Sequence, residues 1–159
     1  MSENEGKRCS IVVMSGDMDK LIGAFSISST AAAMGMETSM FFTFWGLQAL
    51  KKNTPTGRGL FGRMLSLFLK DIDGVGPSKM NFGGLGRWMF KKMMADKGVS
   101  SLREMRQAAL DLGVKLQPCK MSMDVMEIEE DDLIDEVEEG VGAATMILQA
   151  QDADVTFFI

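Results

Sequence analysis

The chain has no histidine and no tyrosine among its 159 residues. The absence of histidine excludes the Cys–His and Ser–His pairs of many hydrolases, because both depend on an imidazole base. It also leaves only two residues, Cys9 and Cys119, of the two types from which most zinc sites are built. Zinc normally takes three or four such ligands, so a zinc protein is not expected.

Long apolar runs are also lacking. No segment approaches the roughly 20 apolar residues that a helix needs to cross a bilayer. The longest run is residues 40–47, which fits a buried strand. The first eight residues are polar, and no hydrophobic region follows them to make a secretory signal. We therefore expect a cytoplasmic protein in which Cys9 and Cys119 do not form a structural disulfide.

Charge is distributed unevenly, although the net charge is only −5. Residues 51–106 carry twelve basic and four acidic side chains, a net of +8. Residues 107–159 carry two basic and thirteen acidic side chains, a net of −11. This polarity fits two solvated faces that neutralise each other within one fold. The alternative is that it steers partners or pairs subunits head to tail.

Four short segments have the apolar, β-branched composition of strands. They are residues 9–14, 38–44, 114–118 and 154–159. Their apolarity is continuous rather than alternating, which predicts strands buried on both faces of a parallel sheet. Helical patterns separate them, so we expect an α/β fold of three layers, with a mostly parallel sheet of about five strands and helices on both faces. A flavodoxin-like topology with right-handed crossovers is expected.

Several of the predicted helices have recognisable ends. The first is expected to begin near residue 20, with Asp17 or Asp19 as its N-cap, and to stop at Gly35. Ser101 and Glu104 have the spacing of a capping box at the start of a later helix. The remaining helices are expected over residues 102–112, 131–139 and 143–151.

We expect residues 1–159 to form a single domain with a basic insertion, rich in glycine and methionine, at about 51–97. This stretch is too long for a simple crossover between strands. It contains two amphipathic pieces, 60–69 and 88–94, and is more apolar than a solvated loop. Part of it is therefore expected to pack against a partner subunit or a membrane surface, or to act as a mobile lid.

Three other patterns have ordinary structural explanations. Residues 57–62 have the G-x-G-x-x-G spacing but do not lie between the first strand and the first helix, so we interpret them as a flexible loop. The acidic run 127–132 fits the solvated start of a helix better than a cation site. The 16 methionines fit core filling, or an adaptable surface for a partner or an acyl-like ligand. No cofactor, metal or nucleic acid is predicted, and flavin or nucleotide binding is only a weaker alternative.

Cys119 is the strongest candidate for a reactive residue. It follows the strand-like residues 114–118, which predicts a place at the carboxyl edge of the sheet, where open α/β sheets hold their chemistry. A helical turn after it, and the charge of Lys120, would favour the nucleophilic thiolate. Without a histidine, this thiol suits sulfur exchange better than acyl hydrolysis. Cys9, by contrast, has the pattern of a small buried hydrophobe.

Three segments together give a family resemblance. They are residues 11–17, residues 40–46 and, above all, Pro118-Cys119-Lys120-Met121-Ser122-Met123. With these segments the chain resembles the DsrE/DsrF-like family of small sulfur-relay proteins, in particular its larger, Met-rich branch, over nearly the whole chain. The resemblance implies a parallel α/β fold, homo-oligomers and a cysteine that carries a persulfide between donor and acceptor proteins. That cysteine would be Cys119.

We therefore predict a sulfurtransferase or sulfur carrier that holds a sulfane sulfur on Cys119 and passes it to a partner thiol. Neighbouring strand ends are expected to form the rim of the site. The rim residues are Ser15, Gly16, Asp17, Met18, Trp45, Gly46, Lys120, Met121 and Ser122. The expected partners are sulfur donor and acceptor proteins and further copies of the chain, with peripheral membrane contact as a further expectation. The alternative is a non-enzymatic assembly module that docks a partner protein or an anionic membrane through the insertion.

Overall fold

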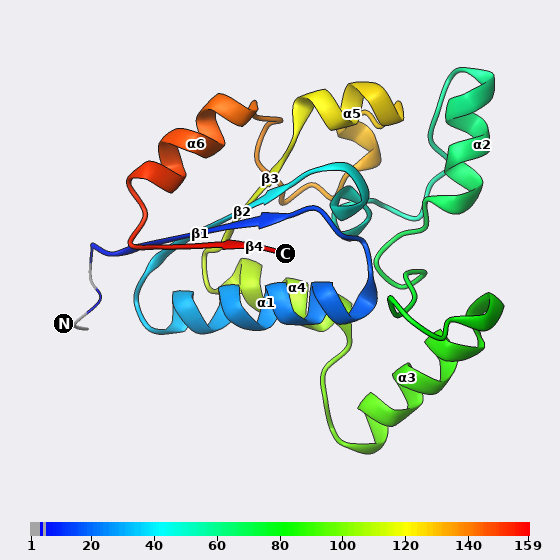
Figure 1. The fold of residues 1–159 in the computed structure, drawn as a ribbon, viewed down its shortest axis with the longest axis horizontal. Helices are drawn as coiled ribbons and strands as arrows, with labels where there is room; N and C mark the ends of the chain where they lie inside the picture. The colour runs from blue at the N-terminus through cyan, green and yellow to red at the C-terminus, as the bar shows by residue number, and fades with distance from the viewer. Residues whose placement is uncertain (1–3, 5) are drawn as a thin grey trace.

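The strands form one parallel sheet in a computed structural model that describes residue 4 and residues 6–159 (Figure 1). The strands are β1 (Arg8–Val13), β2 (Glu37–Phe42), β3 (Lys115–Pro118) and β4 (Val155–Phe158). Their order in the sheet is β3-β2-β1-β4, and every neighbouring pair is parallel. The predicted α/β class and parallel sheet are confirmed, with four strands in the described sheet rather than about five.

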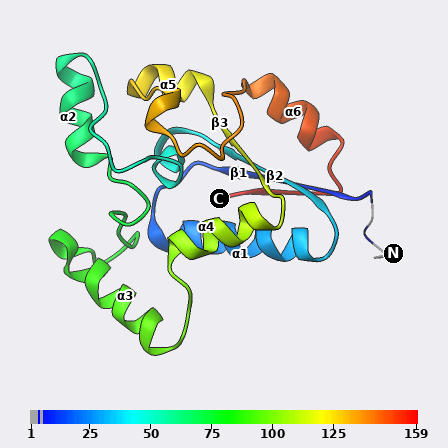
Figure 2. The ribbon, with the colours of Figure 1, turned by 180° about the vertical axis from the view of Figure 1, so that it is seen from behind.

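Helices cover both faces of this sheet (Figures 1 and 2). Helices α1 (Met18–Ala33) and α4 (Leu102–Asp111) lie side by side on one face. Helices α5 (Lys120–Met126) and α6 (Ala143–Gln151) lie on the side of the other face. The chain winds from β1 to β2 and β3 in one direction and returns to β4 on the opposite side of β1, so the winding reverses at β1.

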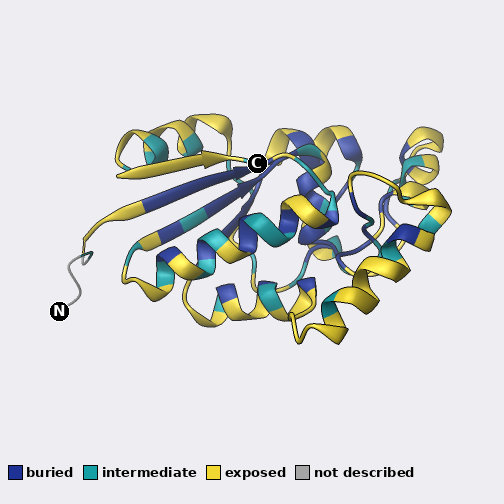
Figure 3. Ribbon diagram, turned by 60° about the horizontal axis from the view of Figure 1, so that its bottom comes forward, coloured by how far each residue is buried: buried dark blue, intermediate teal, exposed yellow. Residues whose placement is uncertain are grey.

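The two central strands are buried on both faces, as their continuous apolarity predicts (Figure 3). On the face toward α1, Ile11 of β1 and Phe42 of β2 belong to the main core, where Phe42 packs against Phe25 with ring centroids 6.1 Å apart. On the opposite face, Val12 and its register partner Phe41 form a smaller cluster. Side chains alternate between the faces of a strand, so each strand supplies both clusters.

Strand β4 does not follow this prediction. Continuous apolarity predicts burial on both faces, but all four β4 residues are exposed. The reason is position, because β4 is an edge strand that pairs with β1 alone in the described sheet. Phe158 is 69% exposed.

The predicted helix ends are close to those observed. Helix α1 begins at Met18 with Asp17 at the N-cap position, although the Asp17 side chain makes no capping bond. Gly35 follows the end of α1 with a left-handed φ of 89°, a conformation that glycine adopts without strain. The predicted capping box is confirmed, because Ser101 and Glu104 each bond the other's backbone N–H.

The insertion contains two amphipathic helices, α2 (Leu60–Phe68) and α3 (Leu85–Asp96), as expected. Short 3-10 helices, η1 (Phe44–Ala49) and η2 (Phe82–Gly84), precede them. Both α2 and α3 lie beyond the carboxyl ends of the strands and project from the body of the domain (Figure 1). Most of their large apolar side chains are exposed, including Phe61 at 80% and Trp88 at 63%. No helix of the described chain is long and apolar enough to span a membrane.

The helix predicted over residues 131–139 is wrong. The chain forms one 3-10 turn there, η3 (Glu130–Asp132), and then continues as a loop. Apart from isolated turn bonds, two of its backbone N–H groups bond to neighbouring segments: the N–H of Ile134 donates to Leu50 and the N–H of Glu138 donates to Leu116. Closely spaced carboxylates repel one another on a helix, which favours this irregular path over a helix.

Candidate functional site

Cys119 lies where strand β3 becomes helix α5. It is the residue after β3 and the N-cap of α5, as the sequence predicts. Its N–H donates to the carbonyl of Phe42 at 2.8 Å, which continues the pairing of β3 with β2. Its carbonyl accepts from the N–H of Met123 at 3.0 Å, the first bond of the helix. The backbone of Cys119 is therefore fixed on both sides.

The Cys119 side chain is buried, with 2% of the residue exposed. It packs with Val12 and Phe41 on the sheet face under α6. Val141 and Met146, which are partly buried, pack against this cluster. Residue 141 also forms a parallel bridge with Cys119, and its carbonyl accepts the N–H of Lys120. The segment 141–146 therefore covers the thiol.

One buried hydrogen bond ties the helix after Cys119 to the neighbouring strand end. The hydroxyls of Ser122 and Thr43 are 2.8 Å apart, and both residues are buried. Thr43 directly follows β2, so the bond joins α5 to the end of a central strand. Ser122 is one of the predicted rim residues, whereas Thr43 was not predicted. The two residues are 79 positions apart, and no local pattern marks their contact.

Two more predicted rim residues, Lys120 and Met121, lie in the first turn of α5. Both are exposed, Met121 to 54%. They do not belong to the buried cluster around the thiol, which is covered by Val141 and Met146. Lys120 and Met121 instead form the surface that surrounds the start of α5.

The other predicted rim residues lie away from Cys119. Ser15, Gly16, Asp17 and Trp45 line a separate cavity of about 550 Å³ at the end of β1, and Cys119 does not line it. The reason is the strand order, which places β2 between β3 and β1. Two strand spacings separate the ends of β3 and β1 by about 10 Å.

The last two predicted rim residues, Met18 and Gly46, contribute to packing. Met18, the first residue of α1, is buried in the main core on the face opposite Cys119. Gly46 allows η1 to approach β1 closely, since a Cβ there would lie 2.3 Å from the carbonyl oxygen of Val13. Of the nine predicted rim residues, the structure thus brings only Lys120, Met121 and Ser122 directly beside Cys119.

Glu127 connects this region to the insertion, and the sequence did not single it out for this role. It ends α5 in a left-handed conformation with φ of 51°. Its carboxylate accepts the backbone N–H groups of Arg58 at 2.6 Å and Gly59 at 2.8 Å, just before α2. Bonds from the N–H groups of Gly59 and Arg58 lower the pKa of Glu127. The start of α2 is therefore anchored to the end of the helix that begins after Cys119.

The second cysteine has different surroundings. Cys9 is buried on β1 and belongs to the main core on the α1 side of the sheet, whereas Cys119 packs on the α6 side. Burial raises the pKa of the Cys9 thiol, which disfavours its thiolate. This agrees with the prediction that Cys9 is a small buried hydrophobe.

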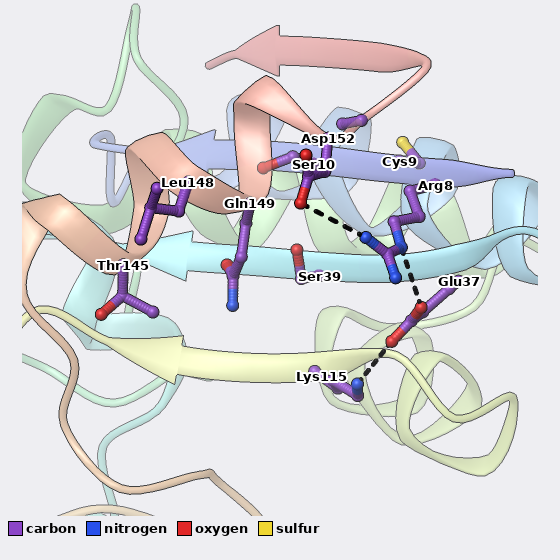
Figure 4. A pocket seen from close by; sticks show the side chains of 11 residues that line it. Arg8, Cys9, Ser10, Glu37, Ser39, Lys115, Thr145, Leu148, Gln149 and Asp152 are labelled. Atoms are coloured by element: carbon purple, nitrogen blue, oxygen red, sulfur yellow. Dashed lines mark hydrogen bonds and ion pairs between the residues drawn. The ribbon is translucent and has the colours of Figure 1, made fainter.

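A second cavity, of about 290 Å³, lies under α6 at the amino ends of the strands (Figure 4). Its rim carries a chain of ion pairs, in which Glu37 accepts from Arg8 at 3.2 Å and from Lys115 at 2.6 Å. The Lys115 ammonium, followed by Arg8, lowers the pKa of Glu37. Such exposed pairs contribute at most about 1 kcal/mol each. They join the amino ends of β1, β2 and β3, at the end of the sheet opposite Cys119.

Comparison with known proteins assigns this chain to a family. The model of the DsrE/DsrF/DrsH-like family matches residues 5–158, nearly the whole chain. The chain belongs to this family. The resemblance seen in the residues around Cys119 is thereby confirmed.

Two relatives cover almost the full length of the chain. An uncharacterized protein YrkE from Bacillus subtilis is 38% identical over 159 residues, 96% of this chain and 97% of that protein. The sulfur carrier protein DsrE2 from Allochromatium vinosum is 33% identical over 160 residues, 98% of this chain and 99% of that protein. The crystal structure of the ychN protein from E. coli matches with a TM-score of 0.57 at 13% identity, over 96% of this chain and 99% of that one. That likeness supports the fold alone.

Proposed function

We propose that this protein is a sulfur carrier that holds a sulfane sulfur on Cys119 as a persulfide and passes it to a partner thiol. The observation that carries the proposal is the place of Cys119, a cysteine fixed at a strand end and a helix start in a chain of the DsrE/DsrF/DrsH-like family. The relative named sulfur carrier protein DsrE2 supports the same function. This similarity favours a carrier over the alternative of a non-enzymatic docking module.

The proposed reaction needs no base beyond the thiolate itself. The Cys119 thiolate attacks the outer sulfur of a donor persulfide, a new S–S bond forms at Cys119, and the donor leaves as a thiolate. In the second step an acceptor thiolate attacks the outer sulfur of the Cys119 persulfide, and Cys119 leaves as a thiolate. One sulfane sulfur moves in each step, and the S–S bond that breaks is replaced by the one that forms. No external oxidant or reductant is consumed.

Transfer requires that the covered thiol become accessible. We infer that α6, with its Met146 side chain, moves away from Cys119 when a partner docks, while Val141 stays bonded to the backbone of Pro118 and Lys120. Helix α6, which supplies Met146, has no buried residue, so little apolar burial is lost when it shifts. Segments with few buried contacts open at low free-energy cost. The exposed Lys120 and Met121 then lie beside the opening, where a partner's thiol would approach.

Mass spectrometry of the intact protein after incubation with a persulfide donor tests the proposal. We expect wild type to gain the mass of one sulfur atom and Cys119→Ser to gain none. Cys9→Ser is the matched control and should still be loaded, because it keeps Cys119 and removes only the cysteine on the opposite face of the sheet. Loading of Cys119→Ser to the level of wild type, or no loading of wild type when a known carrier is loaded in parallel, would reject the proposal.

We also propose that the protein acts as a homo-oligomer. Strand β4 is an exposed edge with Val155, Phe157 and Phe158 on its surface, and an exposed apolar edge is a usual site for association. Light scattering during gel filtration should give a mass above that of one chain, and Phe158→Lys should lower it. A monomeric wild type would reject this part. Peripheral membrane contact and a cytoplasmic location stay predictions.

A further inference from the structure

The cavity at the end of β1 has the position of a ligand site. It measures about 550 Å³ and lies between the sheet and the insertion. The sheet order reverses at β1, which has β2 on one side and β4 on the other. Open α/β sheets bind ligands outside the carboxyl ends of their strands at such a switch point. The volume is also within the usual range for small-molecule sites.

The lining of this cavity carries more positive than negative charge. Lys70 and Arg87 come from the insertion, and Asp17 is the one carboxylate in the lining. One guanidinium nitrogen of Arg87 donates to the carbonyl of Gly74 at 2.6 Å, which holds the side chain in place. Asp17 accepts from the hydroxyl of Ser15 at 3.0 Å. Among the described residues, no carboxylate pairs with Lys70 or Arg87, and both cations are available to an anion.

The backbone of the lining adds donors and close access. The N–H groups of Ser15 and Gly16 donate to no acceptor within the described part of the chain. Backbone N–H groups of this kind complement an oxyanion. Gly83 and Gly84 also line the cavity, with left-handed φ values of 67° and 112°, conformations that glycine adopts without strain.

An aromatic surface completes the cavity. Trp45 is part of the lining and is 50% exposed, although it follows a buried strand. An indole ring in the lining of a cavity favours stacking with a flat ring. The cavity therefore combines groups for an oxyanion with a surface for a planar group.

We propose that this cavity binds a small organic phosphate, with the phosphate between Lys70, Arg87 and the N–H groups of Ser15 and Gly16, and a planar ring beside Trp45. The site goes beyond the sulfur-carrier function, because Cys119 does not line the cavity. It also gives the predicted rim residues at the end of β1 a function of their own, separate from the thiol.

Isothermal titration calorimetry with AMP, adenosine and inorganic phosphate tests the proposal. We expect AMP to bind, phosphate to compete with it, and adenosine to bind much more weakly, because the cations recognise the oxyanion. Equal binding of AMP and adenosine would overturn the proposal. So would the absence of AMP binding at millimolar concentration, where a site of even weak affinity is filled.

Variants separate a built site from general attraction to a basic surface. Lys70→Gln and Arg87→Gln should each weaken AMP binding roughly tenfold, the effect of losing one charge-assisted hydrogen bond. Lys97→Gln is the matched control, an exposed lysine outside the cavity, and equal weakening there would overturn the proposal. Trp45→Ala should weaken AMP more than phosphate. Cys119→Ser should bind AMP normally while losing sulfur loading, which distinguishes failure of this site from failure of the carrier function.

Discussion

The hydrogen bond between Thr43 and Ser122 gives the sharpest prediction about the region of Cys119. Both hydroxyls are buried, 2.8 Å apart, and within the described residues each is the other's only side-chain partner. Removing one hydroxyl leaves the other without a partner in a place that water does not reach. Thr43→Val keeps the side-chain shape, and Ser122→Ala removes the second hydroxyl.

The expected size follows from desolvation. An unsatisfied buried hydroxyl costs about 1–3 kcal/mol, so each single variant should lower the free energy of unfolding by that amount. Alanine has a higher helix propensity than serine, so Ser122→Ala regains about 0.5 kcal/mol of stability, but the variant is still expected to be destabilised. In the double variant neither hydroxyl remains without a partner, so its loss of unfolding free energy should be smaller than the sum of the losses in the two single variants. We expect a coupling energy of about 1–2 kcal/mol.

Urea unfolding of the wild type, the two single variants and the double variant measures this coupling. If the unfolding free energy depends on urea concentration with the same slope in all four proteins, their extrapolated stabilities can be compared directly. Purely additive losses would refute the reasoning, since they would mean that the two hydroxyls do not depend on each other. The rate of Cys119 labelling in the same proteins reports whether the bond also holds α5 in place.

Further predictions concern two glycines, the side chain that covers Cys119 and the carboxylate that anchors α2. Gly46→Ala should destabilise by roughly 1–3 kcal/mol, because its Cβ would lie 2.3 Å from a carbonyl oxygen of β1. Gly23→Ala should instead stabilise by up to about 1 kcal/mol, because a Cβ there, in the middle of α1, meets nothing within 4 Å. Thermal unfolding measures the stability of both variants, and equal effects would contradict the steric argument. Met146→Ala should speed thiol labelling of Cys119 but not of the buried second cysteine, as peptide mapping would show; an unchanged rate would exclude Met146 from the cover. The lowered pKa of Glu127 means that its bonds stabilise the fold above the unfolded carboxyl value near ~4.3 and are lost as pH falls through the lower folded value. The stability difference between wild type and Glu127→Gln should therefore shrink from pH 7 to pH 3, and a constant difference would contradict the anchor.

That the chain is one domain with an insertion at about 51–97 stays a prediction, and limited proteolysis tests it. We expect the first cuts within the insertion, whose helices project from the body and expose large apolar side chains such as Phe61 and Trp88. The segments on either side should stay associated after cleavage, because both contribute to the same sheet. Separation of the two fragments under native conditions would contradict a single domain.

Local signals in the sequence predicted the elements well. Strands β1 and β2, the capping box of Ser101 and Glu104, and the place of Cys119 between a strand and a helix all follow from patterns within a few residues. The error over residues 131–139 has the same origin. That stretch resembles a helix locally, but the N–H groups of Ile134 and Glu138 bond to the end of η1 and to β3.

Sequence patterns were enough to predict the α/β class, the family and Cys119 as the candidate reactive residue, because apolar periodicity, capping and a short motif are local properties of the chain. Tertiary structure alone decided which residues surround the thiol. The strand order β3-β2-β1-β4 inserts β2 between Cys119 and the end of β1, so Ser15 and Trp45 line a different cavity. The folded chain places Val141 and Met146 against the thiol, and it places Thr43 within hydrogen-bond distance of Ser122. Contacts between residues far apart in the sequence depend on how the strands order themselves, and no local pattern encodes that order.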